Sequence, residues 1–243
     1  MRLDAALVAR GLAVDLRGAQ AEVIAGNVLV DETPAVKASD SVTPDQQVRL
    51  RSARARFVSR GGDKLQAALD QFGVPVTDRV AADLGASTGG FTDCLLQAGA
   101  ARVYAVDVGY NQLDWRLRSD PRVVVMERTN ARDLKGLAEP VSLVVGDVSF
   151  ISLARILPAV KRLLVEAGDA ILLIKPQFEV ERGKIEAGGR LRDPAARSAA
   201  IERVLAEAVS AGFEVAGVME SPVPGAKARN IEALVWLRPV TTR

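Results

Sequence analysis

The chain has 243 residues, of which 49% are apolar and 26% are charged, and its formal net charge is +2. This balance is that of a globular protein rather than a disordered one, and the length suits one large domain and one small domain. The net charge is too small to indicate nucleic-acid binding by itself, so the distribution of charge along the chain matters more.

The cysteine and histidine content narrows the possible chemistry. The chain has one cysteine, Cys94, and no histidine, so no disulfide can form within it and the usual general base and zinc ligand are missing. We therefore expect no metal, and catalysis that uses lysine, carboxylates, hydroxyls or a bound cofactor. The first residues carry Arg2, Asp4 and Arg10, unlike a signal peptide, and the apolar runs are too short to span a bilayer. These features predict a cytoplasmic protein without a membrane partner.

The N-terminal residues predict a small α/β module. Leu3, Leu7 and Val8 have the spacing of one helix face, and Gly11 is a suitable cap. Such a module of about 50 to 60 residues is small enough to depend on its neighbour for stability. The other predicted elements are a helix at Arg17–Ala25 that ends at Gly26, and two short strands at Val28–Val30 and Val48–Leu50.

A basic stretch follows this module. Six basic residues and one acid, Asp63, lie between positions 49 and 64, a density that suits contact with phosphate groups although a solvated connector would look similar. We interpret Arg51–Arg60 as a linker between two domains. The basic residues are Arg49, Arg51, Arg54, Arg56, Arg60 and Lys64.

Short apolar runs alternate with helical segments from Val80 onward. Continuous apolar runs are typical of parallel strands that are covered on both faces, and this alternation predicts a doubly wound α/β sheet. A long helix is expected at Pro194–Ala211 with Asp193 as its N-cap, and another at Leu153–Ala167. The seven predicted strands are Val80–Leu84, Val103–Val108, Val123–Met126, Leu143–Val145, Ala170–Ile174, Glu214–Met219 and Ala233–Leu237.

The strongest local motif is the glycine-rich segment Asp83–Phe91, which follows the first of these strands and opens a helix. It is neither the dinucleotide pattern G-x-G-x-x-G nor a Walker loop. An acid before the first glycine suits a cationic ligand group better than a pyrophosphate, and S-adenosylmethionine carries an ammonium and a sulfonium. Asp107 ends the next strand, where a carboxylate can accept hydrogen bonds from ribose hydroxyls. The alternative is a tight strand–helix turn without a ligand.

Four further charged residues stand at the ends of predicted elements. Asp147 and Lys175 follow neighbouring apolar strands, Glu232 begins the last strand, and Lys64 opens the helix before the first strand. This Lys-Asp-Lys-Glu set resembles that of FtsJ-like RNA 2′-O-methyltransferases. Longer segments closely resemble the TlyA (haemolysin-A-like) family, and the resemblance covers essentially the whole chain. These segments are Val58–Leu65, Asp83–Leu96, Asp107–Tyr110, Glu127–Arg132 and Lys175–Glu179.

The resemblance implies an organisation and an activity. We expect an S4-like RNA-binding domain with its basic linker at 1–58, and at 59–243 a seven-stranded Rossmann-like class I methyltransferase domain that uses S-adenosylmethionine. The resemblance implies a ribose 2′-hydroxyl as substrate, on cytidines of 16S and/or 23S rRNA within ribosomal subunits. Lys175 would lie closest to that hydroxyl, held by Asp147, while Lys64 and Glu232 position the ribose.

The family pattern also implies residues that contact the cofactor and the RNA. Asp107 would bind the ribose of the cofactor and Asn130 would lie near its adenine. The N-terminal segment departs from the S4-like pattern, because Asp31-Glu32 replaces the usual Asn-Gly turn and Leu16 replaces a serine. The residues expected along the methionine part are Asp83, Gly85, Ala86, Ser87, Thr88 and Gly89. Those expected to contact RNA are Arg2, Arg10, Arg17, Arg54, Arg56 and Arg60.

Three other functions remain open at this point. The first is a membrane-active haemolysin, although no stretch combines cationic and bulky apolar residues in the way that membrane insertion requires. The second is a non-catalytic RNA-binding factor in ribosome assembly, which the complete Lys-Asp-Lys-Glu set disfavours. The third is a methyltransferase that acts on a protein or a small molecule, which the basic linker disfavours.

Overall fold

A computed structural model describes residues 1–243 apart from 25, 32, 36, 51–55, 226–227 and 241–243. The chain forms two compact units, Met1–Arg56 and Phe57–Arg243. The domain boundary predicted from the sequence, after residue 58, lies two residues beyond the end of the first unit at Arg56.

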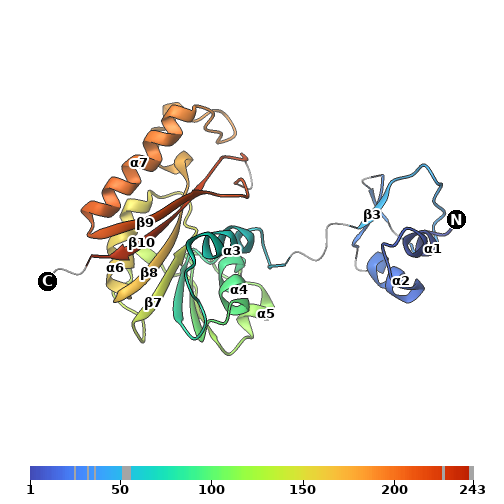
Figure 1. The fold of residues 1–243 in the computed structure, drawn as a ribbon, viewed down its shortest axis with the longest axis horizontal. Coiled ribbons are helices and arrows are strands. Elements are labelled where there is room, and N and C mark those ends of the chain that lie inside the picture. Colours follow the sequence, from blue (N-terminus) through green and yellow to red (C-terminus); the bar gives the residue numbers. More distant parts are fainter. Residues whose placement is uncertain (25, 32, 36, 51–55, 226–227, 241–243) are drawn as a thin grey trace. The chain divides into compact units, whose positions relative to one another are not determined.

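The first unit contains two helices and a small antiparallel sheet (Figure 1). Its core contains Leu3 and Leu7 from the first helix, Val23 from the second, and Val28 from the sheet. The elements are α1 (Leu3–Ala9), α2 (Leu16–Ile24), β1 (Val28–Val30), β2 (Thr33–Pro34) and β3 (Val48–Leu50), with the strand order β2-β1-β3.

The predicted elements of this unit are present. Gly11 and Gly26 follow the two helices with left-handed backbone angles (φ +70° and +71°), which supports their predicted role in ending helices. Strand β2 was not predicted, because a two-residue strand that contains Pro34 gives no alternating pattern. Position 25, the last residue of the predicted second helix, lies outside the described residues.

The second unit is built on a seven-stranded sheet, as predicted. Its strand order is β6-β5-β4-β7-β8-β10-β9, and β4 to β8 run parallel to one another while β10 is antiparallel to both of its neighbours. The parallel strands therefore end at one edge of the sheet, and β10 begins at that same edge. The strands are β4 (Val80–Leu84), β5 (Arg102–Val106), β6 (Val123–Met126), β7 (Val141–Gly146), β8 (Leu164–Ile174), β9 (Phe213–Glu220) and β10 (Ala233–Pro239).

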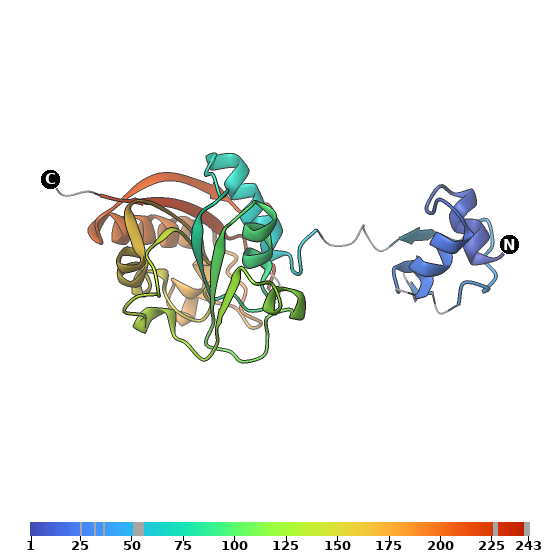
Figure 2. The ribbon, with the colours of Figure 1, turned by 90° about the horizontal axis from the view of Figure 1, so that it is seen from below.

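Helices cover both faces of this sheet (Figure 1). On one face, α3 (Gly61–Phe72), α4 (Gly90–Gln97) and α5 (Trp115–Arg118) pack over a cluster of buried side chains that includes Leu65 and Leu95. Helices α3 and α4 lie side by side in both views (Figures 1 and 2). On the other face, α6 (Leu157–Leu163) and α7 (Pro194–Ser210) cover a second apolar cluster. Burial of the strands on both faces explains their continuous apolar runs.

The prediction of a helix over Leu153–Ala167 is wrong for its last four residues. A 3-10 turn at Leu153–Arg155 leads into α6, which ends at Leu163, and the chain then continues as the first part of β8. Leu164 has extended backbone angles and pairs with Val141 of β7. Apolar spacing alone did not reveal this change, because sheet pairing decided the backbone conformation.

The predicted strand Val103–Val108 is also too long at its end. Strand β5 ends at Val106, and Val108 is exposed in the loop that follows. In α7 the prediction is confirmed, since Asp193 caps the helix by accepting a hydrogen bond from the Ala195 amide and Pro194 occupies its first turn.

Candidate active site

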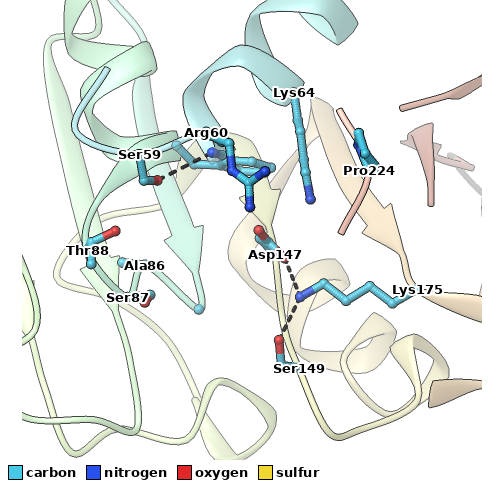
Figure 3. Close-up of a pocket in the computed structure, with 14 residues that line it drawn as sticks. Ser59, Arg60, Lys64, Ala86, Ser87, Thr88, Asp147, Ser149, Lys175 and Pro224 are labelled. Carbon is cyan, nitrogen blue, oxygen red and sulfur yellow. Dashed lines mark hydrogen bonds and ion pairs between the residues drawn. The ribbon is translucent and has the colours of Figure 1, made fainter. Parts of the chain in front are cut away.

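Two adjoining cavities lie where the parallel strands end. One has a volume of about 240 Å³ and is shown in Figure 3, and the other has a volume of about 330 Å³. Both are lined by Gly85, Ser87, Asp147 and Ser149, so they form one continuous groove. The carboxyl edge of a doubly wound sheet is where such folds bind ligands, and their combined size suits a small cofactor beside a substrate group.

The glycine-rich loop between β4 and α4 forms the floor of this groove. The amides of Gly85 and Ala86 donate hydrogen bonds to the carbonyl of Val106, which ties the loop to the end of β5. Gly85 has φ +85°, and a Cβ atom there would lie 3.0 Å from the carbonyl oxygen of Asp147. Only glycine suits this combination of a left-handed backbone and close approach.

The loop residues differ in how they meet the groove. Ala86, Ser87 and Thr88 line the smaller cavity. Gly89 does not line either described cavity but caps α4 with φ +98°. The loop thus presents backbone and small side chains to the groove, as its composition predicts.

Asp83 lies beneath the loop rather than in the groove. Its side chain is fully buried, and Oδ2 accepts a hydrogen bond of 2.7 Å from the Thr92 hydroxyl on α4. Oδ1 has no hydrogen-bond partner among the described residues. Burial raises the pKa of this carboxyl to about 7, partly opposed by the Thr92 hydrogen bond. Asp83 lines neither cavity of the groove, and its predicted place along the methionine part of the cofactor stays a prediction.

Asp107 lines the larger cavity and organises the loops around it. Oδ2 accepts a hydrogen bond of 2.8 Å from the Ser87 amide, and Oδ1 accepts one of 2.6 Å from the Gly109 amide. A carboxylate can accept about four hydrogen bonds, so both oxygens retain capacity for ligand hydroxyls. Asn130 lines the same cavity, while its Oδ1 accepts a hydrogen bond from the Arg132 amide.

Much of the larger cavity is apolar, which no sequence motif indicated. Phe150 is 84% exposed with φ +66°, and its ring lies 5.1 Å from that of Phe178. An apolar pocket with a few polar groups is typical of sites that bind small molecules and cofactors. The apolar side chains that line this cavity are Val106, Val108, Ala131, Val148, Phe150, Ile151 and Ile156.

Two lysine–carboxylate ion pairs stand beside the smaller cavity. Lys64 of α3 and Glu232 form a pair of 2.6 Å whose side chains are 8% and 3% exposed. Lys175 and Asp147 form another pair of 2.6 Å, with side chains 12% and 25% exposed. Figure 3 shows Lys64, Lys175 and Asp147 around one cavity. All four residues of the predicted set are therefore close together.

Strand direction explains why these pairs meet. Asp147 follows β7 and Lys175 follows β8, and these strands are parallel neighbours. Because β10 is antiparallel to β8, Ala233 pairs with Ile174, which places Glu232 and Lys175 at the same edge. Ser149, which sequence reasoning missed, accepts a hydrogen bond of 2.6 Å from Lys175.

The arginines predicted to bind RNA have varied surroundings. Arg60 lines the smaller cavity (Figure 3), Arg56 and Arg17 are exposed, and Arg54 lies outside the described residues. Arg2 donates hydrogen bonds of 2.7 and 3.0 Å to Asp4, and this guanidinium holds the pKa of the carboxyl well below its usual range.

Arg10 is bound to its own unit. Its guanidinium donates hydrogen bonds to the carbonyls of Thr43 and Gln46, at 3.2 and 2.8 Å. Arg2 and Arg10 therefore have structural partners in addition to any role in RNA contact.

Two other predictions concern metal ions and membranes. Over the described part of the chain, no group of three or more cysteine and carboxylate side chains could hold a metal ion. The same residues include no helix with the length and apolar character needed to cross a membrane.

The chain is similar to known methyltransferases. The family model described as FtsJ-like methyltransferase matches residues 57–238. A protein of Mycobacterium tuberculosis named 16S/23S rRNA (cytidine-2'-O)-methyltransferase TlyA is 46% identical over 245 residues, which cover 100% of this chain and 91% of that protein.

Two further similarities carry a different name. Hemolysin A of Brachyspira hyodysenteriae is 39% identical over 237 residues, covering 96% of this chain and 98% of that protein. The solved structure of a Streptococcus thermophilus protein described as a hemolysin has 41% identity and a TM-score of 0.77, and the match covers 100% of this chain and 89% of that one. The family match and these identities over nearly whole chains agree with the fold and the groove. The chain is therefore a methyltransferase that belongs to the FtsJ-like family.

Proposed function

We propose that this methyltransferase transfers a methyl group from S-adenosylmethionine to the 2′-hydroxyl of a cytidine ribose in ribosomal RNA. The observation that carries the proposal is the pair of lysine–carboxylate contacts, both 2.6 Å, beside a cavity that adjoins a second, largely apolar cavity. The relative named as an rRNA (cytidine-2'-O)-methyltransferase supports the choice of substrate.

The residues of the groove fit S-adenosylmethionine, which supplies a methyl group on a sulfonium when bound. Asp107 retains acceptor capacity for ribose hydroxyls, and Asn130 stands in the apolar part of the groove that suits adenine. Gly85, Ser87 and Thr88 would follow the methionine part. Asp83 would act from beneath the loop, by holding α4 and the glycine-rich turn through Thr92.

In this proposal Lys175 interacts with the ribose hydroxyl. Its ammonium forms an ion pair of 2.6 Å with Asp147 and donates a hydrogen bond of 2.6 Å to the Ser149 hydroxyl, which together hold it at the edge of the cavity. A fixed cation stabilises the negative charge that develops on an attacking hydroxyl oxygen. Lys64 and Glu232 would position the ribose, so positioning and electrostatics would supply most of the rate.

The first unit would act as an S4-like RNA-binding domain over residues 1–58, joined by the basic linker. Arg17 and Arg56 are exposed, and in this proposal they contact phosphate groups of the RNA, while Arg60 would contact RNA at the cavity itself. Arg2 and Arg10 would contribute from the module, and Arg54 remains a prediction outside the described residues. Ribosomal RNA within ribosomal subunits as substrate would place the enzyme in the cytoplasm.

The test is transfer of labelled methyl from S-adenosylmethionine to unmodified 30S subunits, 50S subunits and free rRNA. We expect label at one nucleotide, where the ribose methyl group blocks alkaline cleavage. Lys175→Ala should abolish the label while leaving RNA binding intact, which separates an enzyme from a non-catalytic RNA-binding factor.

A matched control is Lys161→Ala, because Lys161 lies on exposed α6 surface away from the groove and bonds only to backbone carbonyls among the contacts described. This variant should methylate at the wild-type rate. Cofactor binding without label in any of these RNAs would overturn the proposed substrate and direct the search to proteins or small molecules.

A further inference from the structure

We propose that Gln177 is a positioning residue that couples the two ion pairs of the active site; this inference rests on the proposed function. Gln177 lies in the 3-10 turn Pro176–Phe178, two residues after Lys175. Its Nε2 donates a hydrogen bond of 3.1 Å to Oε1 of Glu232, whose other oxygen binds Lys64 at 2.6 Å. Gln177 thus joins the backbone next to one lysine to the carboxylate that holds the other.

The orientation of this amide follows from hydrogen-bond chemistry. An ionised carboxylate can only accept, so the nitrogen of Gln177 must face Glu232. The amide oxygen is then buried without a hydrogen-bond partner among the described residues. An unsatisfied buried acceptor destabilises the fold, so this arrangement points to a role in the site rather than in stability.

The surroundings of Glu232 leave little freedom for its side chain. It is 3% exposed, and a Cβ atom on Gly225 would lie 2.8 Å from its Oε1. One oxygen is therefore enclosed between the Gly225 backbone and the Gln177 amide, while the other faces Lys64. A buried ion pair needs its remaining lone pairs satisfied to keep one geometry, and Gln177 supplies that donor.

The turn that carries Gln177 is itself well anchored. Pro176 restricts the backbone after Lys175, and the Phe178 amide donates a hydrogen bond of 2.8 Å to the Lys175 carbonyl. A displacement of the Gln177 amide would therefore shift Glu232 and Lys64 on one side and the backbone of Lys175 on the other. Misplacement of reacting groups by about 1 Å can lower a rate roughly a hundredfold.

Two substitutions separate this role from packing. Gln177→Met keeps a similar shape but removes the donor, and should lower kcat roughly ten- to hundredfold at every pH while KM for the cofactor stays unchanged. Gln177→Glu places two carboxyls together, and the pKa of the introduced group is raised by its neighbour. When protonated it can donate to Glu232 as the amide does, and when ionised it repels Glu232.

The charged groups on the elements that pack around Gln177 are Lys64 on α3, Asp147 after β7, Lys175 after β8 and Glu232 before β10. Activity of Gln177→Glu should therefore approach that of the wild type at low pH and fall as pH rises through the raised pKa. Gln66→Glu is a matched control, since Gln66, half-buried on α3, donates to the Asp70 carboxylate at 2.8 Å in an exposed contact, so the same substitution is made beside a carboxylate outside the active site. Its activity relative to the wild type should not depend on pH in this way.

The experiment has two arms over about pH 5.5 to 9. The first measures the melting temperature of the protein alone, where Gln177→Glu should fall relative to Gln177→Met as pH rises, and by more than Gln66→Glu falls relative to the wild type, because solvent screens the exposed contact with Asp70. The second measures single-turnover methylation of rRNA. A flat melting difference, or a wild-type kcat for Gln177→Met, would overturn the inference. A wild-type protein that methylates no rRNA counts against the proposed function, and the melting arm still decides whether Gln177 holds Glu232.

Discussion

The two ion pairs of the active site have the same length but different surroundings. Lys64 and Glu232 lie 2.6 Å apart with side chains 8% and 3% exposed, whereas Lys175 and Asp147, also 2.6 Å apart, are 12% and 25% exposed. The charged groups of the buried pair, Lys64 and Glu232, have lost their hydration, so each depends on the other. Those of the more exposed pair, Lys175 and Asp147, can also interact with water or a ligand in the cavity. The same contact is therefore suited to positioning in one case and to chemistry in the other.

A third pair extends the comparison to the opposite edge of the sheet. Arg79 and Asp169 lie 2.8 Å apart, with side chains 14% and 12% exposed, where the parallel strands begin rather than end. Trp236 and Arg238 also donate hydrogen bonds to Asp169. Burial similar to that of the Lys175 pair thus occurs far from the groove. If the proposed function is correct, position relative to the carboxyl edge, more than burial, distinguishes a pair that serves the reaction.

The largest expected effect is on the rate of methyl transfer and concerns the Lys175–Asp147 pair. Lys175→Met should lower kcat about 10²- to 10³-fold, because it removes the cation that the proposed function places next to the reacting hydroxyl. Single-turnover transfer of labelled methyl measures this loss. Calorimetry should show cofactor affinity close to that of the wild type. A rate above about one tenth of the wild-type value would remove Lys175 from the proposed chemistry.

Loss of the buried pair, Lys64 and Glu232, should lower the free energy of unfolding more than loss of the Lys175–Asp147 pair. Glu232→Gln leaves the Lys64 ammonium buried without a compensating charge, and should lower the free energy of unfolding by about 3 to 5 kcal/mol. Asp147→Asn should lower it by only about 1 kcal/mol, because Lys175 retains contact with Ser149 and the cavity. Urea unfolding of both variants measures the difference. Equal losses would show that exposure does not distinguish the two pairs.

Much of the fold and of this set of charges could be predicted from the sequence. Strands β4 and β6 were predicted with their observed bounds, because continuous apolar runs between polar turns leave little choice of boundary. Asp147 and Lys175 could be placed at one edge because parallel strands end together. Lys64 and Glu232 were added through the resemblance to a family, since their sequence separation gives no local signal.

Other features depended on tertiary contacts that spacing does not reveal. Residues after Leu163 continue a helical apolar pattern, but pairing with β7 makes them strand. Asp83 directly precedes the glycine-rich loop, yet its side chain points to Thr92 because successive strand residues face opposite sides of the sheet. The apolar lining of the larger cavity is ordinary core composition, so residues such as Ile151 and Ile156 carried no functional signal.

Asp83 is a buried carboxyl whose described hydrogen-bond partner is the Thr92 hydroxyl rather than a cation. The pKa of Asp83 is raised from 3.8 to about 7, chiefly by burial. Between these values the folded state binds a proton that the unfolded state has lost, so stability falls as pH rises from about 4 to about 7, by about 1.4 kcal/mol for each pH unit. Asp83→Asn should remove this slope and should gain stability relative to the wild type up to about pH 7. Urea unfolding of the cofactor-free proteins at several pH values measures the free energy of unfolding of both. A difference between Asp83→Asn and the wild type that is constant with pH would contradict the raised pKa.

A smaller effect than that of Glu232→Gln is expected for the pair at the opposite edge of the sheet. Asp169→Asn removes a charge that Arg79, Trp236 and Arg238 share, and should lower the free energy of unfolding by about 1 to 3 kcal/mol. Because the Asp169 side chain lines neither cavity of the groove, kcat and KM at a temperature well below unfolding should equal those of the wild type. Urea unfolding and single-turnover methylation on the same preparation measure both quantities. A lowered kcat without a matching loss of folded protein would mean that the sheet transmits strain from its far edge to Lys175, and that position at the carboxyl edge does not by itself separate catalytic pairs from structural ones.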